Sequence, residues 1–185
     1  MEFIPTDIPE VILIKPDVHG DDRGYFMETY RREIFMEHNI RDEFVQDNLS
    51  KSRKDTIRGF HYQIKNPQAK LIMVTQGEVL DVAVDIRRSS PTFGKHVTAR
   101  LSEQNKCMLY IPVGFAHGFQ VLSNETIFQY KCSDYYNPDG ERGIAWDDPD
   151  IGVQWLPGDF IISPKDNKNP LLRDITADDL PNFSE

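Results

Sequence analysis

The sequence predicts an all-β fold, a sandwich or barrel with few helices. Short stretches rich in β-branched and aromatic residues recur along the chain, and Gly, Pro and Asn separate them at regular intervals. Strands at such spacing are typical of sandwiches and barrels, whereas βαβ folds place a helix between successive strands. We expect one domain over residues 1–185, a length that can bury a sizeable core.

The first elements precede residue 40. Four apolar residues at 11–14 predict a strand, and the Asp-Asp-Arg-Gly sequence at 21–24 predicts a turn. Residues 25–30 predict a second strand. Residues 31–38 place apolar side chains at 34, 35 and 36 among charged ones, which predicts a short helix.

From residue 38 onward the pattern is one of successive strands. We expect strands at 69–74, 78–86, 96–101, 107–111, 118–122 and 127–132, with turns at 76–77, 90–91 and 102–105. Two histidine-containing segments, 58–63 and 111–119, also have strand character. The tail from Pro164 is polar and rich in Asp, so we expect it to form loop or short helix over one end of the domain.

The composition narrows the choice of partners. A net charge of −9 and a pI near 5.0 argue against nucleic acid and an anionic membrane, although a few arginines can still make one cleft positive for an anionic small molecule. No stretch has the length that spans a bilayer, and the first residues lack signal-peptide features. Cys107 and Cys132 are too few for a disulfide framework, so we expect two reduced, buried thiols and a cytoplasmic protein.

The two histidine segments are the most informative part of the chain. His61 lies in Arg-Gly-Phe-His-Tyr-Gln at 58–63, and His117 lies in Pro-Val-Gly-Phe-Ala-His at 112–117. The pair resembles the two-motif signature of the cupin superfamily, which implies a double-sheet jelly roll with a pocket in its mouth. Metal-binding cupins have a second histidine where this chain has Gln63. Two imidazoles alone are a poor ligand set, so we expect no metal here.

Histidine suits proton transfer because its pKa lies near neutrality. A catalytic histidine is commonly oriented by a carboxylate, and Asp81, Asp85 and Asp166 are the candidates. Asp81 and Asp85 share one face of a strand, which is either the solvent face of the sheet or the wall of a polar pocket. Two structurally satisfied core histidines are the alternative to a catalytic pair.

Two further residues have both a structural and a catalytic interpretation. Lys70 begins an apolar run nine residues after His61. It either extends to solvent along its apolar stem or supplies a cation that stabilises a developing oxyanion. Tyr130 is either a core tyrosine or the acid that works opposite a histidine base.

A longer series of segments resembles one enzyme family nearly end to end, the dTDP-4-dehydrorhamnose 3,5-epimerases. The matching segments are residues 22–26, 44–48, 58–63, 77–85, 90–94, 111–119, 146–149 and 161–166. The resemblance implies a cofactor-free enzyme that acts on a 4-keto-6-deoxy sugar linked to dTDP. A base removes the acidic protons next to the ketone to form an enolate, and an acid returns a proton on the opposite face.

The resemblance also implies roles for individual residues. His61 matches the general base, Asp166 its carboxylate partner, Tyr130 the proton donor and Lys70 the residue beside the enolate oxygen. Residues that match substrate-binding positions are Arg23, Phe26, Glu28, Gln46, Asn48, Arg58, Asp81, His117, Tyr136, Glu141 and Lys165. Family members form homodimers by exchanging N-terminal strands, so a homodimer is expected.

Several alternatives stay open at this point. Relatives that invert only C3 or only C5 share the same catalytic residues, and others isomerise the keto group. A metal-dependent cupin enzyme and a non-catalytic nucleotide-sugar-binding protein belong to different classes. The double epimerase is the interpretation that the segments favour.

Overall fold

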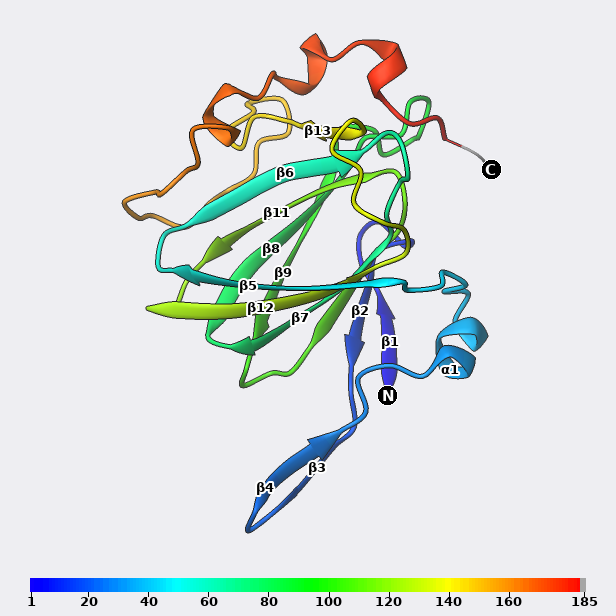
Figure 1. Ribbon diagram of the computed structural model, residues 1–185, viewed down its shortest axis with the longest axis vertical. Coiled ribbons are helices and arrows are strands. Elements are labelled where there is room, and N and C mark those ends of the chain that lie inside the picture. Colours follow the sequence, from blue (N-terminus) through cyan, green and yellow to red (C-terminus); the bar gives the residue numbers. More distant parts are fainter. Residues whose placement is uncertain (184–185) are drawn as a thin grey trace.

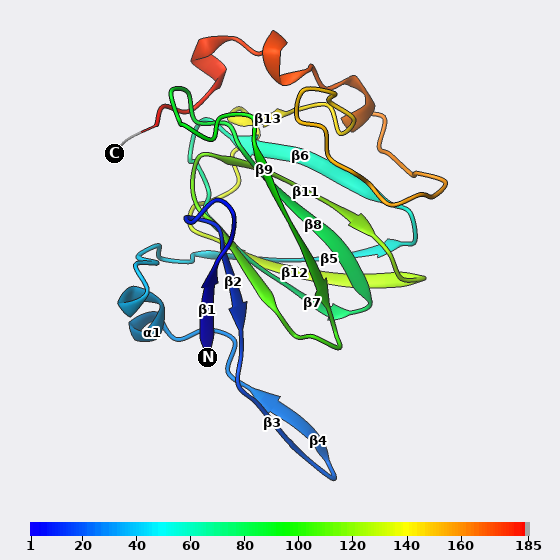
Figure 2. The same cartoon turned by 180° about the vertical axis from the view of Figure 1, so that it is seen from behind.

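The computed structural model describes residues 1–183, and two β-sheets packed face to face form its body (Figures 1 and 2). One sheet has six strands in the spatial order β1 (Glu2–Pro5), β2 (Ile12–Lys15), β10 (Met108–Ile111), β7 (Lys70–Gln76), β12 (Glu125–Cys132) and β5 (Gln46–Arg53). The other has five, in the order β13 (Glu141–Gly143), β6 (Ile57–Gln63), β11 (Phe115–Val121), β8 (Glu78–Asp85) and β9 (His96–Ser102). This double-sheet jelly roll confirms the predicted all-β fold.

Three peripheral features complete the chain. A two-stranded hairpin of β3 (Val18–Asp21) and β4 (Gly24–Met27) projects away from the sheets, and α1 (Arg32–Glu37) follows it (Figure 1). Three 3₁₀ helices, η1 (Asp166–Lys168), η2 (Leu172–Asp174) and η3 (Ala177–Asp179), occupy the C-terminal tail. No helix within residues 1–183 has both the length and the apolar character of a membrane span.

Most of the predicted elements are confirmed. The strands expected at 11–14, 69–74, 78–86, 96–101, 107–111, 118–122 and 127–132 correspond to β2 and β7 to β12, and the helix expected at 31–38 corresponds to α1. The strand expected at 25–30 ends earlier, at Met27. Strands β1, β3, β5 and β13 were not predicted. The sequence of β5, QDNLSKSR, is polar and has no β-branched residue, yet it pairs over its whole length with β12.

The main core lies between the two sheets. Ile72 and Phe128 of the six-stranded sheet pack against Val79, Ala83 and Phe119 of the five-stranded sheet. Successive residues of a strand face opposite sides, so the alternate residues of β8 point away from this core. They are buried as well, because the C-terminal segment covers the outer face of the five-stranded sheet.

The covering segment brings distant residues onto β6 and β8. Leu172 and Leu180 pack against Phe60, Val82 and Val84 on the outer face of the sheet. The tail forms short helices and loops, as predicted, and lies over the outer face of this sheet (Figure 1, orange to red). Its position places Asp166 next to β6.

The two aspartates of β8 lie on its inner face, which also carries Val79 and Ala83. Asp81 and Asp85 are both 0% exposed, so their shared face is not the solvent face of the sheet. Asp85 accepts hydrogen bonds from Arg87 Nε at 2.9 Å, Ser90 Oγ at 2.6 Å and Thr92 Oγ1 at 2.6 Å. Asp85 was a candidate for the carboxylate that orients a histidine, and this prediction is wrong. Its oxygens instead accept hydrogen bonds from the turn that follows β8.

The packing of the tail leads to a stability prediction. Leu172→Ala should lower the free energy of unfolding by about 2–5 kcal/mol, because the cavity would lie in a buried cluster that joins tail and sheet. Leu49→Ala, at a side chain that is 67% exposed, is the matched control and should change it by less than about 0.5 kcal/mol. Urea unfolding followed by circular dichroism measures both. Equal effects for the two variants would mean that the tail does not contribute to the core.

Candidate active site

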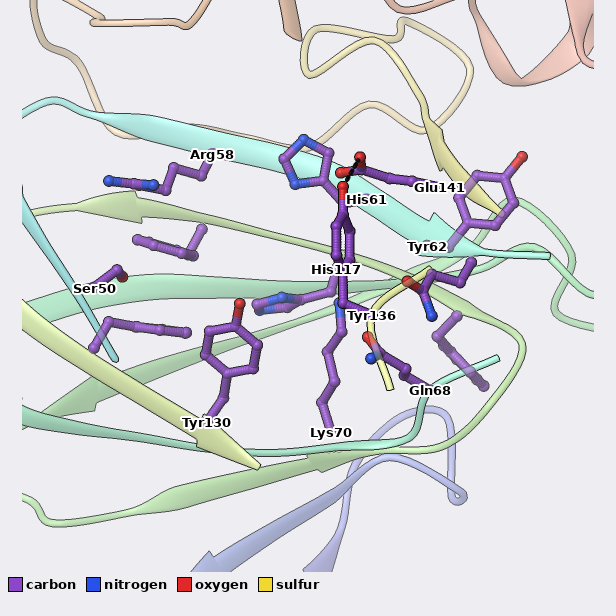
Figure 3. Close-up of a pocket in the computed structure, with 14 residues that line it drawn as sticks. Ser50, Arg58, His61, Tyr62, Gln68, Lys70, His117, Tyr130, Tyr136 and Glu141 are labelled. Carbon is purple, nitrogen blue, oxygen red and sulfur yellow. Dashed lines mark hydrogen bonds between the residues drawn. The ribbon is translucent and has the colours of Figure 1, made fainter. Parts of the chain in front are cut away.

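A polar cavity of about 190 Å³ opens between the two sheets (Figure 3). Seven residues singled out in the sequence line it: Arg58, His61, Lys70, His117, Tyr130, Tyr136 and Glu141. They come from five different strands and one loop. The fold therefore gathers into one cavity residues from Arg58 to Glu141, which lie 83 positions apart in the sequence.

His61 and Asp166 form the first acid–base pair of the site. His61 Nε2 lies 2.6 Å from Asp166 Oδ1, and the carboxylate side chain is only 4% exposed. Burial opposes ionisation of this carboxylate. The hydrogen bonds from His61 and from the Gly59 backbone outweigh burial, so the pKa of Asp166 lies below its ordinary value. The carboxylate thus remains ionised and fixes the orientation of the imidazole.

A close approach of two strands positions this histidine. His61 on β6 is the cross-strand partner of His117 on β11. Gly59 has a φ of +126°, and a Cβ at that position would lie 2.5 Å from the Cα of Gly118. Glycine is therefore required where the two histidine-bearing strands meet.

His117 and Asp81 form a second pair deeper in the pocket. His117 Nε2 lies 3.0 Å from Asp81 Oδ2. Burial lowers the pKa of His117, although the Asp81 carboxylate opposes the shift. The imidazole ring also lies among the rings of Phe119 and Phe128, at centroid distances of 6.1 and 6.0 Å. This histidine is thus fixed and favours the neutral form.

Lys70 and Tyr130 supply a cation and a phenol. Lys70 starts β7, and its partly buried side chain extends into the cavity (Figure 3). Burial lowers the pKa of its ammonium group. Tyr130 enters from β12, in the sheet opposite to that of His61, and burial raises the pKa of its hydroxyl. A protonated phenol and a histidine thus enter the same cavity from opposite sheets.

The rim of the cavity carries a network of charged and amide groups. Glu141 Oε2 accepts hydrogen bonds from Tyr136 Oη at 2.8 Å and from Lys165 Nζ at 2.6 Å. Burial opposes ionisation of Glu141, but these two donors outweigh it, so its pKa is lowered. Gln46 Nε2 donates to Asn48 Oδ1 at 3.1 Å along the inner edge of β5. The predicted rim residues therefore lie together.

Three predicted residues lie elsewhere in this chain. Arg23 and Phe26 are on the projecting β3–β4 hairpin and Glu28 follows it, and none of the three lines the cavity. Arg23 pairs with Asp21, and the side chain of Phe26 is 71% exposed. Their expected contact with a nucleotide at this cavity has no basis within a single copy of the chain.

The cavity also includes residues for which the sequence predicted no role in the site. They are Ser50, Tyr62, Gln63, Gln68, Phe115, Phe119 and Phe128. A period of two would have found several of them, because strand residues two apart share a face. Phe119 follows His117 by two positions, and Phe128 precedes Tyr130 by two. Gln63 stands in the same relation to His61.

The donor set of the site favours acid–base chemistry. Within residues 1–183 no group of three or more His, Cys, Asp or Glu side chains is arranged to hold a metal ion. His61 and His117 are each hydrogen-bonded to a carboxylate instead. Both cysteines are free and buried, as expected.

Comparison with known proteins places the chain in a family. The family described as dTDP-4-dehydrorhamnose 3,5-epimerase matches residues 5–174. The dTDP-4-dehydrorhamnose 3,5-epimerase of Methanothermobacter thermautotrophicus is 48% identical over 175 residues, which cover 93% of this chain and 95% of that protein. The crystal structure of a dTDP-6-deoxy-D-glucose-3,5-epimerase from Legionella pneumophila, in complex with dTDP-4-keto-L-rhamnose, matches with a TM-score of 0.98 and 47% identity, covering 100% of this chain and 99% of that one.

A more distant solved structure shows how widely the fold is used. A 3'-monoepimerase from Streptomyces bikiniensis, in complex with dTDP-quinovose, matches with a TM-score of 0.88 and 31% identity, covering 96% of this chain and 92% of that one. The fold and the cavity define a cupin-type jelly-roll isomerase. The similarity over nearly the whole chain is more specific, and the chain belongs to the dTDP-4-dehydrorhamnose 3,5-epimerase family.

We expect the contribution of the Asp166 carboxylate to the free energy of unfolding to depend on pH. Its folded pKa lies below the ordinary 3.8, so the contribution is present above that pH and is lost as pH falls through the folded pKa. Asp166→Asn should lower the free energy of unfolding by about 1–3 kcal/mol at neutral pH, and the difference from wild type should shrink at about pH 3. Urea unfolding at the two pH values measures this difference.

Asp178→Asn is the matched control, because Asp178 is exposed on η3. It should unfold like wild type at both pH values. A difference for Asp166→Asn that stays constant with pH would contradict the assigned role of the ionised carboxylate.

Proposed function

We propose that the protein is a cofactor-independent epimerase that converts dTDP-4-dehydro-6-deoxy-D-glucose to dTDP-4-dehydro-L-rhamnose by inverting C3 and C5. One observation carries the proposal. A histidine with an ionised carboxylate partner and a partly buried tyrosine enter one cavity from opposite sheets, and a partly buried lysine lies in the same cavity. Family membership supplies the substrate class.

The proposed reaction uses the acidity of protons next to the ketone. Nε2 of His61 is bonded to Asp166, so Nδ1 is the nitrogen that can take a proton from carbon. The C–H electron pair becomes the enolate C=C bond, and the negative charge moves to the ketone oxygen beside Lys70. Tyr130 then protonates the same carbon from the opposite face, and solvent restores both side chains. Repetition at the second carbon completes the double inversion.

The pKa directions support these roles. A raised pKa keeps the Tyr130 hydroxyl protonated until a strongly basic carbon forms. A lowered pKa favours neutral His117, whose Nε2–H donates to Asp81, so Nδ1 can accept a hydrogen bond from a sugar hydroxyl without the imidazole competing as a cation with Lys70. Asp81 and Asp166 hold the two imidazoles in fixed orientations.

The main alternative functions differ in the number of carbons that are inverted. A single-site epimerase of a related nucleotide 4-ketosugar is the alternative, because a 3'-monoepimerase has the same fold. Identity of 48% to a double epimerase over nearly the whole chain favours inversion at both carbons. A metal-dependent cupin enzyme would need ligands beyond the two histidines.

We further propose that a homodimer completes the nucleotide site. Arg58 lines the cavity and Lys165 lies at its rim, where both can neutralise a diphosphate. Arg23, Phe26 and Glu28 can reach such a ligand only from a second copy whose hairpin extends to this cavity. The exposed aromatic rings of Tyr25 and Phe26 fit insertion of the hairpin into another subunit. Free buried cysteines fit a cytoplasmic enzyme.

The reaction is tested by deuterium incorporation. Incubation of the protein with the 4-keto sugar nucleotide in heavy water should introduce deuterium at both C3 and C5, as read by NMR. His61→Ala should abolish incorporation at both carbons while dTDP still binds. Tyr130→Phe should slow inversion roughly 10²–10⁴-fold, because the ring is kept and the acid is removed.

Each class of function gives a different result in this experiment. Label at one carbon alone would identify a single-site epimerase, and an unlabelled sugar that nevertheless binds would identify a binding protein. Full activity of His61→Ala would remove His61 from the role of base, and near-normal inversion by Tyr130→Phe would remove Tyr130 from the role of donor.

Mixing two inactive variants tests the shared site. Arg23→Ala and His61→Ala subunits, unfolded and refolded together, form mixed dimers with one intact site if the hairpin serves the partner's cavity. Random pairing should then restore about a quarter of wild-type activity. Each variant refolded alone is the control. Complete lack of recovery after verified mixing would show that the hairpin acts within its own chain or not at all.

A further inference from the structure

The loop that crosses the mouth of the cavity is held by side-chain amides. Residues 134–137 lie in the loop between β12 and β13 and include Tyr136, which lines the cavity. This segment belongs to neither sheet. The backbone N–H and C=O groups of this segment need hydrogen-bond partners, and glutamine side chains from neighbouring elements provide several of them.

Gln63 is central to this arrangement. Its Oε1 accepts a hydrogen bond from the Asn137 backbone N–H at 2.7 Å. Its Nε2 donates to the backbone carbonyls of Asn66 at 2.6 Å and Tyr135 at 3.3 Å. One carboxamide therefore fixes the backbone on both sides of Tyr136 and joins it to the loop that follows β6.

Two other glutamines hold the same segment. Gln46 Oε1 accepts from the Tyr136 backbone N–H at 2.8 Å, and Gln68 Nε2 donates to the Asp134 carbonyl at 2.8 Å. Each of the four consecutive loop residues thus has at least one backbone group bound by a glutamine. These bonds are uncharged, and one charged contact adds to them, because the Asp134 carboxylate accepts from the Tyr135 backbone N–H at 2.7 Å.

The Tyr136 ring has little else to hold it. Tyr136 is 54% exposed, so packing alone does not determine its orientation. Its hydroxyl donates to Glu141 Oε2, and Figure 3 shows the ring in the middle of the residues that line the cavity. The direction of the ring therefore follows from the backbone that the glutamines fix.

We propose that Gln63 is a positioning residue for the reaction, one that acts through Tyr136. By fixing residues 135–137 it holds the Tyr136 ring as one wall of the sugar-binding cavity, and this wall keeps the ring of the keto sugar between His61 and Tyr130. The inference rests on the proposed epimerase function. A glutamine is required because the position needs a donor and an acceptor at once, which neither leucine nor glutamate supplies at neutral pH.

Two variants test the hydrogen bonds. Gln63→Leu removes donor and acceptor, and Gln63→Glu keeps the acceptor but places a carboxylate against two carbonyls. Both should lower kcat between about tenfold and a hundredfold with a smaller change in KM, because displacement of a reacting group by an ångström has effects of that size. Gln104→Leu is the matched control, since Gln104 is exposed and bonds only to Glu103. It should behave as wild type.

A double-mutant cycle separates positioning from direct contact. If Gln63 acts through the tyrosine ring, Gln63→Leu should change kcat by less than about twofold in a Tyr136→Ala background. An effect in that background as large as in wild type would overturn the proposal, because Gln63 would then act on the substrate or on the fold directly.

Amide hydrogen exchange gives a readout that needs no turnover. Gln63→Leu should speed exchange of the Asn137 amide by about tenfold or more, whereas Gln104→Leu should leave it unchanged. Unchanged exchange in Gln63→Leu would overturn the proposal whatever the activity. The proposal would also be overturned if Gln63→Leu exchanged this amide faster but kept the wild-type kcat and the wild-type ratio of deuterium incorporated at C3 and at C5. Failure of the wild type itself to incorporate deuterium would refute the epimerase function instead.

Discussion

The hydrogen bond between His61 and Asp166 joins two parts of the chain that are 105 residues apart, and the candidate site depends on it. It requires the C-terminal segment to fold back over the outer face of the five-stranded sheet, where Leu172 and Leu180 are buried. The apolar contacts supply the free energy for this arrangement, and the carboxylate determines the orientation of the imidazole. Stability of the tail and chemistry of the site are therefore coupled.

The face of β8 that lies between the two sheets carries two aspartates. Asp81 and Asp85 share this face with Val79 and Ala83 and are fully buried, in a medium where an isolated charge is costly. Each is matched to hydrogen-bond donors, His117 for the first and the Arg87 turn for the second. The two aspartates share a strand, a face and full burial, but they have different hydrogen-bond partners. The alternation of side chains along a strand therefore identifies which residues share a face, but not what each residue does.

The pattern of apolar residues predicted most of the strands because those strands are largely buried and rich in apolar residues, many of them β-branched. It missed β5, whose residues are polar and whose strand conformation comes from pairing with β12, eighty residues later. The candidate site was likewise predicted only in part, because long-range contacts determine the rest. Motif resemblance identified His61, Tyr130 and Asp166, but the residues alone left three carboxylates as candidates, since long-range contacts determine which one meets the imidazole. Gln63 shows a further limit, because its partners are backbone groups of a loop that has no sequence pattern.

Lys70 differs from the other charged groups of the cavity. Within residues 1–183, His61, His117 and Glu141 each have a hydrogen-bonded partner of opposite or complementary charge, whereas Lys70 has neither an ion pair nor a hydrogen bond. Partial removal of an ammonium group from water costs stability, and this desolvation lowers the pKa of Lys70. In the proposed reaction the enolate oxygen is the missing partner. At about 4 Å and an effective dielectric constant near 20, such a pair is worth about 4 kcal/mol. That energy corresponds to roughly a thousandfold in rate, and it is available because the folded protein holds the cation in place before charge develops.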